Sequence, residues 1–71
     1  MEQQTLDFLD KLKQEKAKIN KKYRLIVIYS IGILETFFKA DCETIEEAQN
    51  EYKDFTKRVK FPIIHTEIIE I

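Results

Sequence analysis

Few side chains in this chain could carry out covalent or metal chemistry. Cys42 is the only cysteine and His65 the only histidine in 71 residues. A cysteine just before a helix can have a lowered thiol pKa, but thiol catalysis also needs a base and donors for an oxyanion. One cysteine, one histidine and scattered carboxylates have no spacing typical of a metal site. We therefore expect neither a catalytic thiol nor a bound metal.

Two carboxylates, Glu35 and Glu67, lie in segments that we expect to be strands, so they could approach one another across a sheet. Carboxylates that act as an acid and a base need a cleft that holds a substrate, and so short a chain has little room for one. The sequence therefore predicts a protein that is not an enzyme and has no cofactor.

The strongest charge pattern is a basic segment from Lys11 to Arg24, in which seven lysines and arginines stand against one acid. The net charge of the chain is only −1, so the remainder is acidic. Such a segment could contact the phosphates of a nucleic acid. The candidates for phosphate contact are Lys11, Lys18, Lys21, Lys22 and Arg24.

These basic residues do not form one stripe on a helix, and Tyr23 is the only aromatic residue among them. A helix that binds phosphate usually gathers its charge on one side, and a surface for single strands needs more aromatic rings. Solvated helix surface is therefore the favoured interpretation. Contact with nucleic acid and contact with an acidic protein stay open as alternatives.

Acidic residues gather at the expected start of the second helix and along it. They are Asp41, Glu43, Glu46, Glu47, Glu51 and Asp54. An acidic cluster of this kind can occupy a basic groove that otherwise holds nucleic acid. Helix capping and solubility explain the same residues equally well, so both interpretations stay open.

Two segments have the periodicity of helices. In residues 5–20, three leucines recur at every third position among good helix-forming residues. In residues 44–59 a longer apolar stripe follows the sequence Thr44-Ile-Glu-Glu47, which is a capping box. In this motif Thr44 accepts a hydrogen bond from the amide of Glu47, while the carboxylate of Glu47 reaches back to the amide of Thr44.

Two further segments have the composition of strands. Residues 23–40 are expected to form a hairpin around Gly32, the only glycine, because a tight hairpin turn needs a residue with positive φ. A turn at Ile31–Gly32 would place Tyr29 opposite Leu34. Residues 62–71 begin with a proline and then become rich in isoleucine, which predicts a last strand.

The order αββαβ over residues 1–71 predicts a single small α+β domain. A hairpin followed by a crossover helix brings the third strand beside the first, in a three-stranded antiparallel sheet of order 2-1-3. The amphipathic helix 44–59 would cover one face of this sheet, and the N-terminal helix is the remaining element.

The hairpin is apolar on both faces, and helix 44–59 can cover only one of them. Ile26, Ile28 and Phe37 belong to the other face. This face is covered either by the N-terminal helix, through Leu6, Leu9 and Leu12, or by another molecule.

The last strand is expected to be an edge of the sheet. Five isoleucines between Ile63 and Ile71 favour pairing with another chain. We predict a homodimer in which two copies of this strand pair across a two-fold axis, and addition to a foreign strand is the alternative. A lone edge protected by Glu67 and Glu70 is the third alternative. Together with the open face, this strand gives the candidates for protein contact: Ile26, Ile28, Phe37, Ile63, His65, Glu67 and Ile69.

A cytoplasmic location fits three features of the sequence. Met1–Asp10 is acidic and lacks the apolar core of a signal peptide, and Leu25–Leu34 is about half the length of a membrane-spanning helix. A lone cysteine excludes an intramolecular disulfide and suits a reducing compartment. We therefore expect no association with a membrane.

In size, in its content of lysine, isoleucine and glutamate, and in its αββαβ plan, the chain resembles small accessory proteins of low-GC bacteria and their phages. Many such proteins, the anti-CRISPR proteins among them, bind and inhibit one host protein. The resemblance rests on no specific motif. It implies a protein-binding module that inhibits by occluding a surface. The alternatives are a nucleic-acid-binding accessory factor that uses residues 11–24, and a purely structural homodimer subunit.

Overall fold

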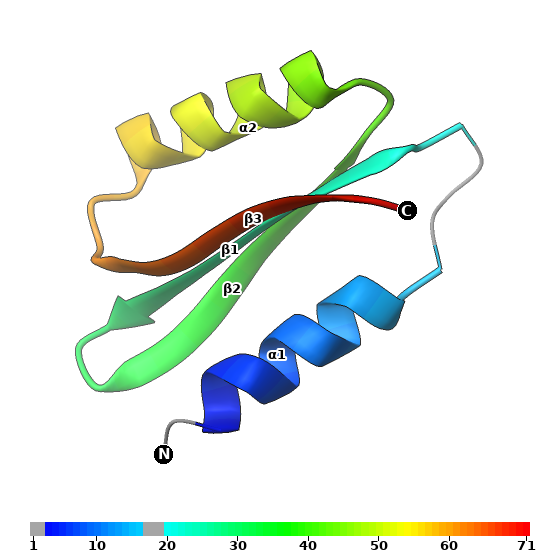
Figure 1. Cartoon of the computed structure of the whole chain (residues 1–71). Coiled ribbons are helices and arrows are strands. Elements are labelled where there is room, and N and C mark those ends of the chain that lie inside the picture. Colours follow the sequence, from blue (N-terminus) through cyan, green and yellow to red (C-terminus); the bar gives the residue numbers. More distant parts are fainter. Residues whose placement is uncertain (1–2, 17–19) are drawn as a thin grey trace.

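The structure, a computed structural model, describes residues 3–16 and 20–71, and its account of side chains begins at residue 9. Its elements are α1 (Gln3–Gln14), β1 (Tyr23–Ile31), β2 (Leu34–Cys42), α2 (Ile45–Arg58) and β3 (Ile63–Glu70). The strands form an antiparallel sheet in the order β2-β1-β3, with α2 on one face and α1 on the other (Figure 1). The expected α+β fold and its strand order are confirmed.

Helix α2 begins and ends close to the expected residues because its caps are encoded locally. The amide of Glu47 donates to Thr44 Oγ1 at 3.2 Å, which is the first half of the expected capping box. The second half differs, because the Glu47 carboxylate accepts from the amide of Glu43, at 3.3 Å, rather than from that of Thr44. At the other end, the amide of Val59 donates to the carbonyl of Phe55 at 2.8 Å.

The hairpin turn contains Gly32 with φ +61°, as expected, but it lies one residue later than expected. Ile31 pairs with Leu34, so the central residues of the turn are Gly32 and Ile33, and Tyr29 pairs with Thr36 rather than with Leu34. The predicted register is therefore wrong by two residues. A shift of two residues keeps every side chain on its predicted face, because side chains alternate with a period of two.

The odd-numbered residues of β1 face α2. Leu25 and Val27 are fully buried there against Ala48 and Phe55 of α2. The rings of Tyr29 and Phe38 also contact Phe55, with centroid distances of 5.2 Å and 4.7 Å. This is the larger of the two apolar clusters, and it holds α2 to the sheet.

The even-numbered residues of β1 face α1. Ile26 and Ile28 are fully buried there with Leu12, and Leu9 and Ile69 pack against them. The N-terminal helix therefore covers the second face of the sheet in cis, which is the first of the two alternatives. Ile26 and Ile28, candidates for protein contact, are not open to another molecule. Leu6, the third leucine expected in this cover, precedes the side chains that the structure describes.

Helix α1 ends at Gln14, whereas the periodicity predicted a helix to about residue 20. Asn20, just before β1, has a φ of +72°, a conformation that asparagine tolerates better than most residues. Within the described residues, neither helix is long and apolar enough to cross a bilayer.

Candidate protein-binding surface

A buried arginine joins α1 to the sheet. Arg24 lies on β1 with none of its surface exposed, and it forms a double hydrogen bond with Asp41 of β2. The Nε–Oδ1 distance is 2.7 Å and the Nη2–Oδ2 distance is 2.9 Å. The remaining donors reach three backbone carbonyls, that of Leu12 in the last turn of α1 and those of Glu15 and Lys16 just after it, at 2.6, 2.9 and 3.4 Å. All five N–H groups of the guanidinium therefore have an acceptor.

This arrangement explains how a short helix stays on the sheet. The last carbonyls of a helix have no partner within it, and here a side chain from the sheet supplies donors to them. The hydrogen bond with Asp41 raises the pKa of Arg24 against the opposing effect of burial, so the guanidinium remains charged. Arg24 is thus a structural residue, and it was wrongly included among the candidates for phosphate contact.

Ion pairs flank the buried strip between α1 and the sheet on both sides. On the β3 side, Lys13 Nζ lies 2.8 Å from Glu67 Oε2, and His65 Nε2 lies 2.9 Å from Glu67 Oε1. These contacts, that with Lys13 first, lower the pKa of Glu67. On the β2 side, Lys39 pairs with Glu15. Two candidates for protein contact, His65 and Glu67, are therefore engaged within the chain. Glu67 binds Lys13 of α1 and His65 binds Glu67.

Exposed apolar side chains concentrate at one end of the molecule. Among the residues whose side chains are described, eight large hydrophobic residues are exposed. Six of them belong to the hairpin turn or to the segment that enters β3, and we call this set the apolar end: Ile31, Ile33, Leu34, Phe61, Ile63 and Ile64. Ile33 is 99% exposed and Leu34 is 68% exposed. Of the other two, Phe37 follows the turn on β2 and Ile45 begins α2.

The two segments of the apolar end lie side by side. The amide of Ser30 donates to the carbonyl of Pro62 at 3.0 Å, and Tyr29 pairs with Ile63 across the sheet. The ring of Tyr29 also stacks on Phe61, with centroids 6.2 Å apart. Figure 1 shows the turn and the connection from α2 to β3 at the same end of the sheet, opposite the C-terminus. These contacts place the two segments of the apolar end next to each other.

Basic residues border the apolar end on the α2 side. Lys57 and Arg58 occupy the last turn of α2, and Lys60 follows just before Phe61. All three side chains are exposed. The apolar end therefore combines isoleucine and leucine side chains with positive charge from one side.

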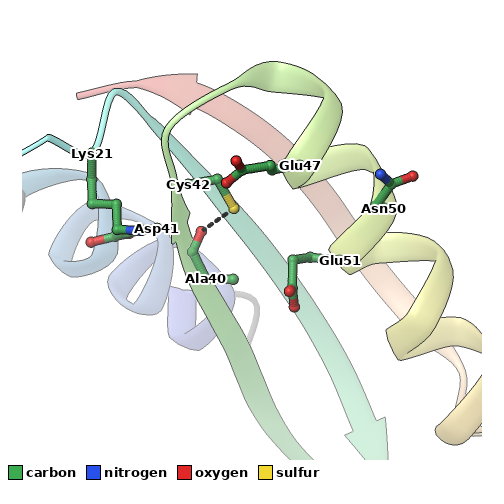
Figure 2. Close-up of a pocket in the computed structure, with 7 residues that line it drawn as sticks. All are labelled: Lys21, Ala40, Asp41, Cys42, Glu47, Asn50 and Glu51. Atoms are coloured by element: carbon green, nitrogen blue, oxygen red, sulfur yellow. Dashed lines mark hydrogen bonds between the residues drawn. The ribbon is translucent and has the colours of Figure 1, made fainter.

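The opposite end of the molecule is polar and contains a shallow pocket between α2 and the end of β2 (Figure 2). Its volume is about 410 Å³. It is lined by Lys21, Ala40, Asp41, Cys42, Glu47, Asn50 and Glu51. One lysine and three carboxylates line this pocket, and one of the carboxylates, Asp41, is paired with Arg24.

Cys42 lies at this pocket but is not an activated thiol. Its side chain is buried, and its Sγ donates to the carbonyl of Ala40 at 3.9 Å. Burial raises the pKa of the Cys42 thiol, and the carboxylates of Glu51 and Glu47 raise it further. The expectation that a helix start could lower this pKa is therefore wrong. Across the part of the chain that the structure describes, no three His, Cys, Asp or Glu side chains group as metal ligands.

The other charged candidates do not come together as a single patch. Lys11 is exposed on α1, whereas Lys21 and Lys22 lie beside carboxylates at the polar end. Lys18 lies outside the described residues. Among the acids, Asp41 pairs with Arg24 and Glu47 caps α2, while Glu51 is half-buried. Glu43, Glu46 and Asp54 remain exposed.

Of the candidates for protein contact, Ile63 is exposed at the apolar end, Phe37 is exposed beside it, and Ile69 is half-buried under α1. Sequence reasoning missed the turn residues and Phe61. The sequence did contain a signal for an apolar turn. Its only glycine is surrounded by isoleucine and leucine, whereas turns usually carry polar residues.

Comparison of the chain with protein-family models, with curated proteins and with solved structures finds no match.

Proposed function

We propose that this protein is a non-enzymatic protein-binding module that docks on another protein through its apolar end. The observation that carries the proposal is the gathering of six of the eight exposed large hydrophobic side chains at one end. Soluble monomers seldom gather exposed apolar side chains at one place unless these side chains serve a contact. Two candidates for protein contact, Ile26 and Ile28, are covered by α1, so we place the contact at the end of the sheet instead.

The free energy available from burying apolar surface favours the hairpin tip, Ile33 and Leu34, as the centre of the contact. Ile33 and Leu34 are largely exposed, and burying one such side chain contributes about 1.5–3 kcal/mol. The tip is convex, so it fits a pocket on the partner. Lys57, Arg58 and Lys60 favour a partner whose pocket has carboxylates on one border, because opposite charges guide association and select among partners.

The action that fits this surface is occlusion. A domain that binds through a protruding tip covers its partner's surface without needing a cleft or a reactive group of its own. We extend the proposal to inhibition of a cytoplasmic host protein, the role of the phage accessory proteins that the chain resembles. The single, buried Cys42 is compatible with a reducing compartment.

Site-specific crosslinking identifies the partner and tests the proposed surface together. A photoreactive phenylalanine analogue replaces Ile33 in one variant and Gln49, an exposed residue of α2, in the other. Irradiation in cells should link a discrete protein to the Ile33 variant and not to the Gln49 variant. The identified protein is then purified, and its affinity for the wild-type chain is measured directly.

The matched variants for that affinity measurement are Ile33→Asp and Ile45→Asp. Both residues are exposed isoleucines, but Ile45 lies at the polar end, at the start of α2. Loss of a hydrophobic contact at the centre of an interface weakens the binding free energy by about 2 kcal/mol or more, which lowers the affinity about 30-fold. We expect Ile33→Asp to weaken binding by about that factor and Ile45→Asp to leave it unchanged. Equal affinities of Ile33→Asp and wild type would contradict the proposal.

A further inference from the structure

Strand β3 is the accessible edge of the sheet. β2 and β3 are both edge strands, because β1 lies between them. However, α1 and α2 both pack over β1 and β2, so helices flank the β2 edge on its two faces. The helices contact β3 less than β2. α1 reaches β3 through Ile69 and through the Lys13–Glu67 pair, while Ile63, Ile64 and Thr66 along β3 are exposed. An edge of this kind offers unpaired backbone groups to another strand.

The hydrogen bonds to β1 decide which backbone groups of β3 point outward. The amide of Ile71 donates to the carbonyl of Lys22 at 2.9 Å, so these two residues form a hydrogen-bonded pair. Hydrogen-bonded pairs alternate along an antiparallel ladder, and the register has no irregularity between Ile71 and His65. The backbone groups of His65, Glu67 and Ile69 therefore face β1. Those of Thr66 and Ile68 face outward.

We propose that a second copy of this chain pairs with β3 in antiparallel orientation, across a two-fold axis at Thr66. Thr66 of each copy then forms a hydrogen-bonded pair with Thr66 of the other copy, and the two sheets become one sheet of six strands. This homodimer uses Ile64 of the apolar end but not the hairpin turn, and it does not depend on the contact that the turn makes.

The side chains of β3 select this register over its neighbours. An axis at Glu67 would place two carboxylates opposite each other, and an axis at His65 would place two imidazoles opposite each other. An axis at Thr66 instead places His65 opposite the second copy's Glu67, in a pair where side chains are closest. The same register brings Ile68 opposite the second copy's Ile64, which is exposed in the single chain. The strand is thus complementary to itself.

The dimer would present two apolar ends. β3 begins at the apolar end and runs toward the C-terminus (Figure 1). Because the two copies of β3 run in opposite directions, their apolar ends lie at opposite ends of the six-stranded sheet. One dimer can therefore hold two partner molecules that face away from each other.

The first test is the molar mass of the wild-type protein, measured by light scattering and sedimentation equilibrium at tens of micromolar. We expect the mass of two chains, falling toward that of one chain on dilution. Amide hydrogen exchange on the same samples gives a second measurement that needs no variant. The amides of Thr66 and Ile68 should exchange slowly in the concentrated sample and rapidly in the dilute one. A single-chain mass at every concentration would overturn the proposal.

Cysteine crosslinking tests the register. Cα atoms of a hydrogen-bonded pair lie about 5.5 Å apart, within the range that a disulfide spans. With diamide as oxidant, Thr66→Cys should give a disulfide-linked dimer. Ile68→Cys should give no such dimer, because in this register residue 68 of one copy lies opposite residue 64 of the other. Thr36→Cys, on the β2 edge, should give none either. Linkage through residue 36 or 68 but not through residue 66 would overturn the proposed pairing. Circular dichroism verifies that each variant is folded.

Discussion

Arg24 and Asp41 are directly opposite residues on β1 and β2, and the guanidinium of one binds both carboxylate oxygens of the other beneath the end of α1. The same guanidinium binds three carbonyls of α1 and the residues that follow it. One side chain thus connects two strands and a helix. The stability of α1 on the sheet should therefore depend on this residue more than on any exposed charge.

Replacing Arg24 by lysine should destabilise the protein by about 2–3 kcal/mol, because an ammonium group cannot reproduce five directed hydrogen bonds. Asp41→Asn leaves the buried guanidinium without its counter-charge and should cost about 3 kcal/mol. Lys39→Gln, which removes the exposed pair with Glu15, is the control and should cost at most about 1 kcal/mol. Urea unfolding followed by circular dichroism measures all three. An Arg24→Lys variant as stable as wild type would contradict this role.

Ile28→Glu and Ile33→Glu should behave in opposite ways. Ile28 is fully buried beneath α1, so a glutamate there should unfold the protein or cost at least about 3 kcal/mol. Ile33 is almost fully exposed, so the same change should shift stability by no more than about 0.5 kcal/mol. Thermal unfolding distinguishes the two outcomes. A folded, stable Ile28→Glu protein would mean that α1 does not cover this face in solution.

Gly32→Ala should destabilise the hairpin by about 1–2 kcal/mol. The cost comes from the backbone, since φ is +61° and a Cβ built at this position meets nothing within 4 Å. Chemical synthesis allows a matched control with D-alanine, which favours positive φ and should be neutral or stabilising. Equal stability of the two alanine diastereomers would show that the turn does not require this conformation.

The thiol of Cys42 should react slowly with Ellman's reagent in the native protein. Burial and the nearby carboxylates keep the thiol protonated, and reaction requires the protein to open. We expect a rate at least about 100-fold below that of the urea-unfolded chain, since local opening costs several kcal/mol. Glu51→Gln should leave the native rate low, because burial is the main cause. Rapid native labelling would contradict the buried position of the thiol.

Stability should fall at acidic pH partly through Glu67. Its pKa is lowered from the ordinary value of 4.5 by Lys13 and then by His65, so its ionised form stabilises the folded state. That contribution is complete above the ordinary pKa and is lost as the pH falls through the lowered pKa of the folded state. It should amount to about 0.5–1 kcal/mol, because the ion pair is partly exposed.

Urea unfolding at a series of pH values measures the difference between wild type and Glu67→Gln. The difference should be constant near neutrality and shrink below about pH 4.5. Glu70→Gln, an exposed change on the same strand, serves as the control. A difference that grows on acidification would have the wrong sign and would refute the role assigned to Glu67.

Local signals in the sequence were sufficient for the elements and their order. Thr44 and Glu47 fix the start of α2 through a cap, and Gly32 fixes the region of the turn, because both effects depend on a few adjacent residues. The hairpin register was missed by two residues because either register satisfies the same alternation of faces. The length of α1 was overestimated because its last turn is decided by Arg24, which is distant in sequence.

The candidate site was harder to predict, because charge alone does not distinguish a surface residue from a buried one. Arg24 was assigned to a phosphate contact from its basic neighbours. Its position on the same strand face as Ile26 and Ile28, with Asp41 on the same face of the next strand, indicated burial instead. The apolar end depends on two loops that become neighbours only through the pairing of β1 with β3.

The position of Arg24 also has a consequence for the order in which the chain assembles. During synthesis α1 leaves the ribosome before β1 and β2, yet the carbonyls at its end bind a guanidinium of β1 that is held in place by Asp41 of β2. The apolar strip beneath it also needs Ile69, near the end of β3. We therefore expect α1, which is made before the three strands, to dock only after they have paired.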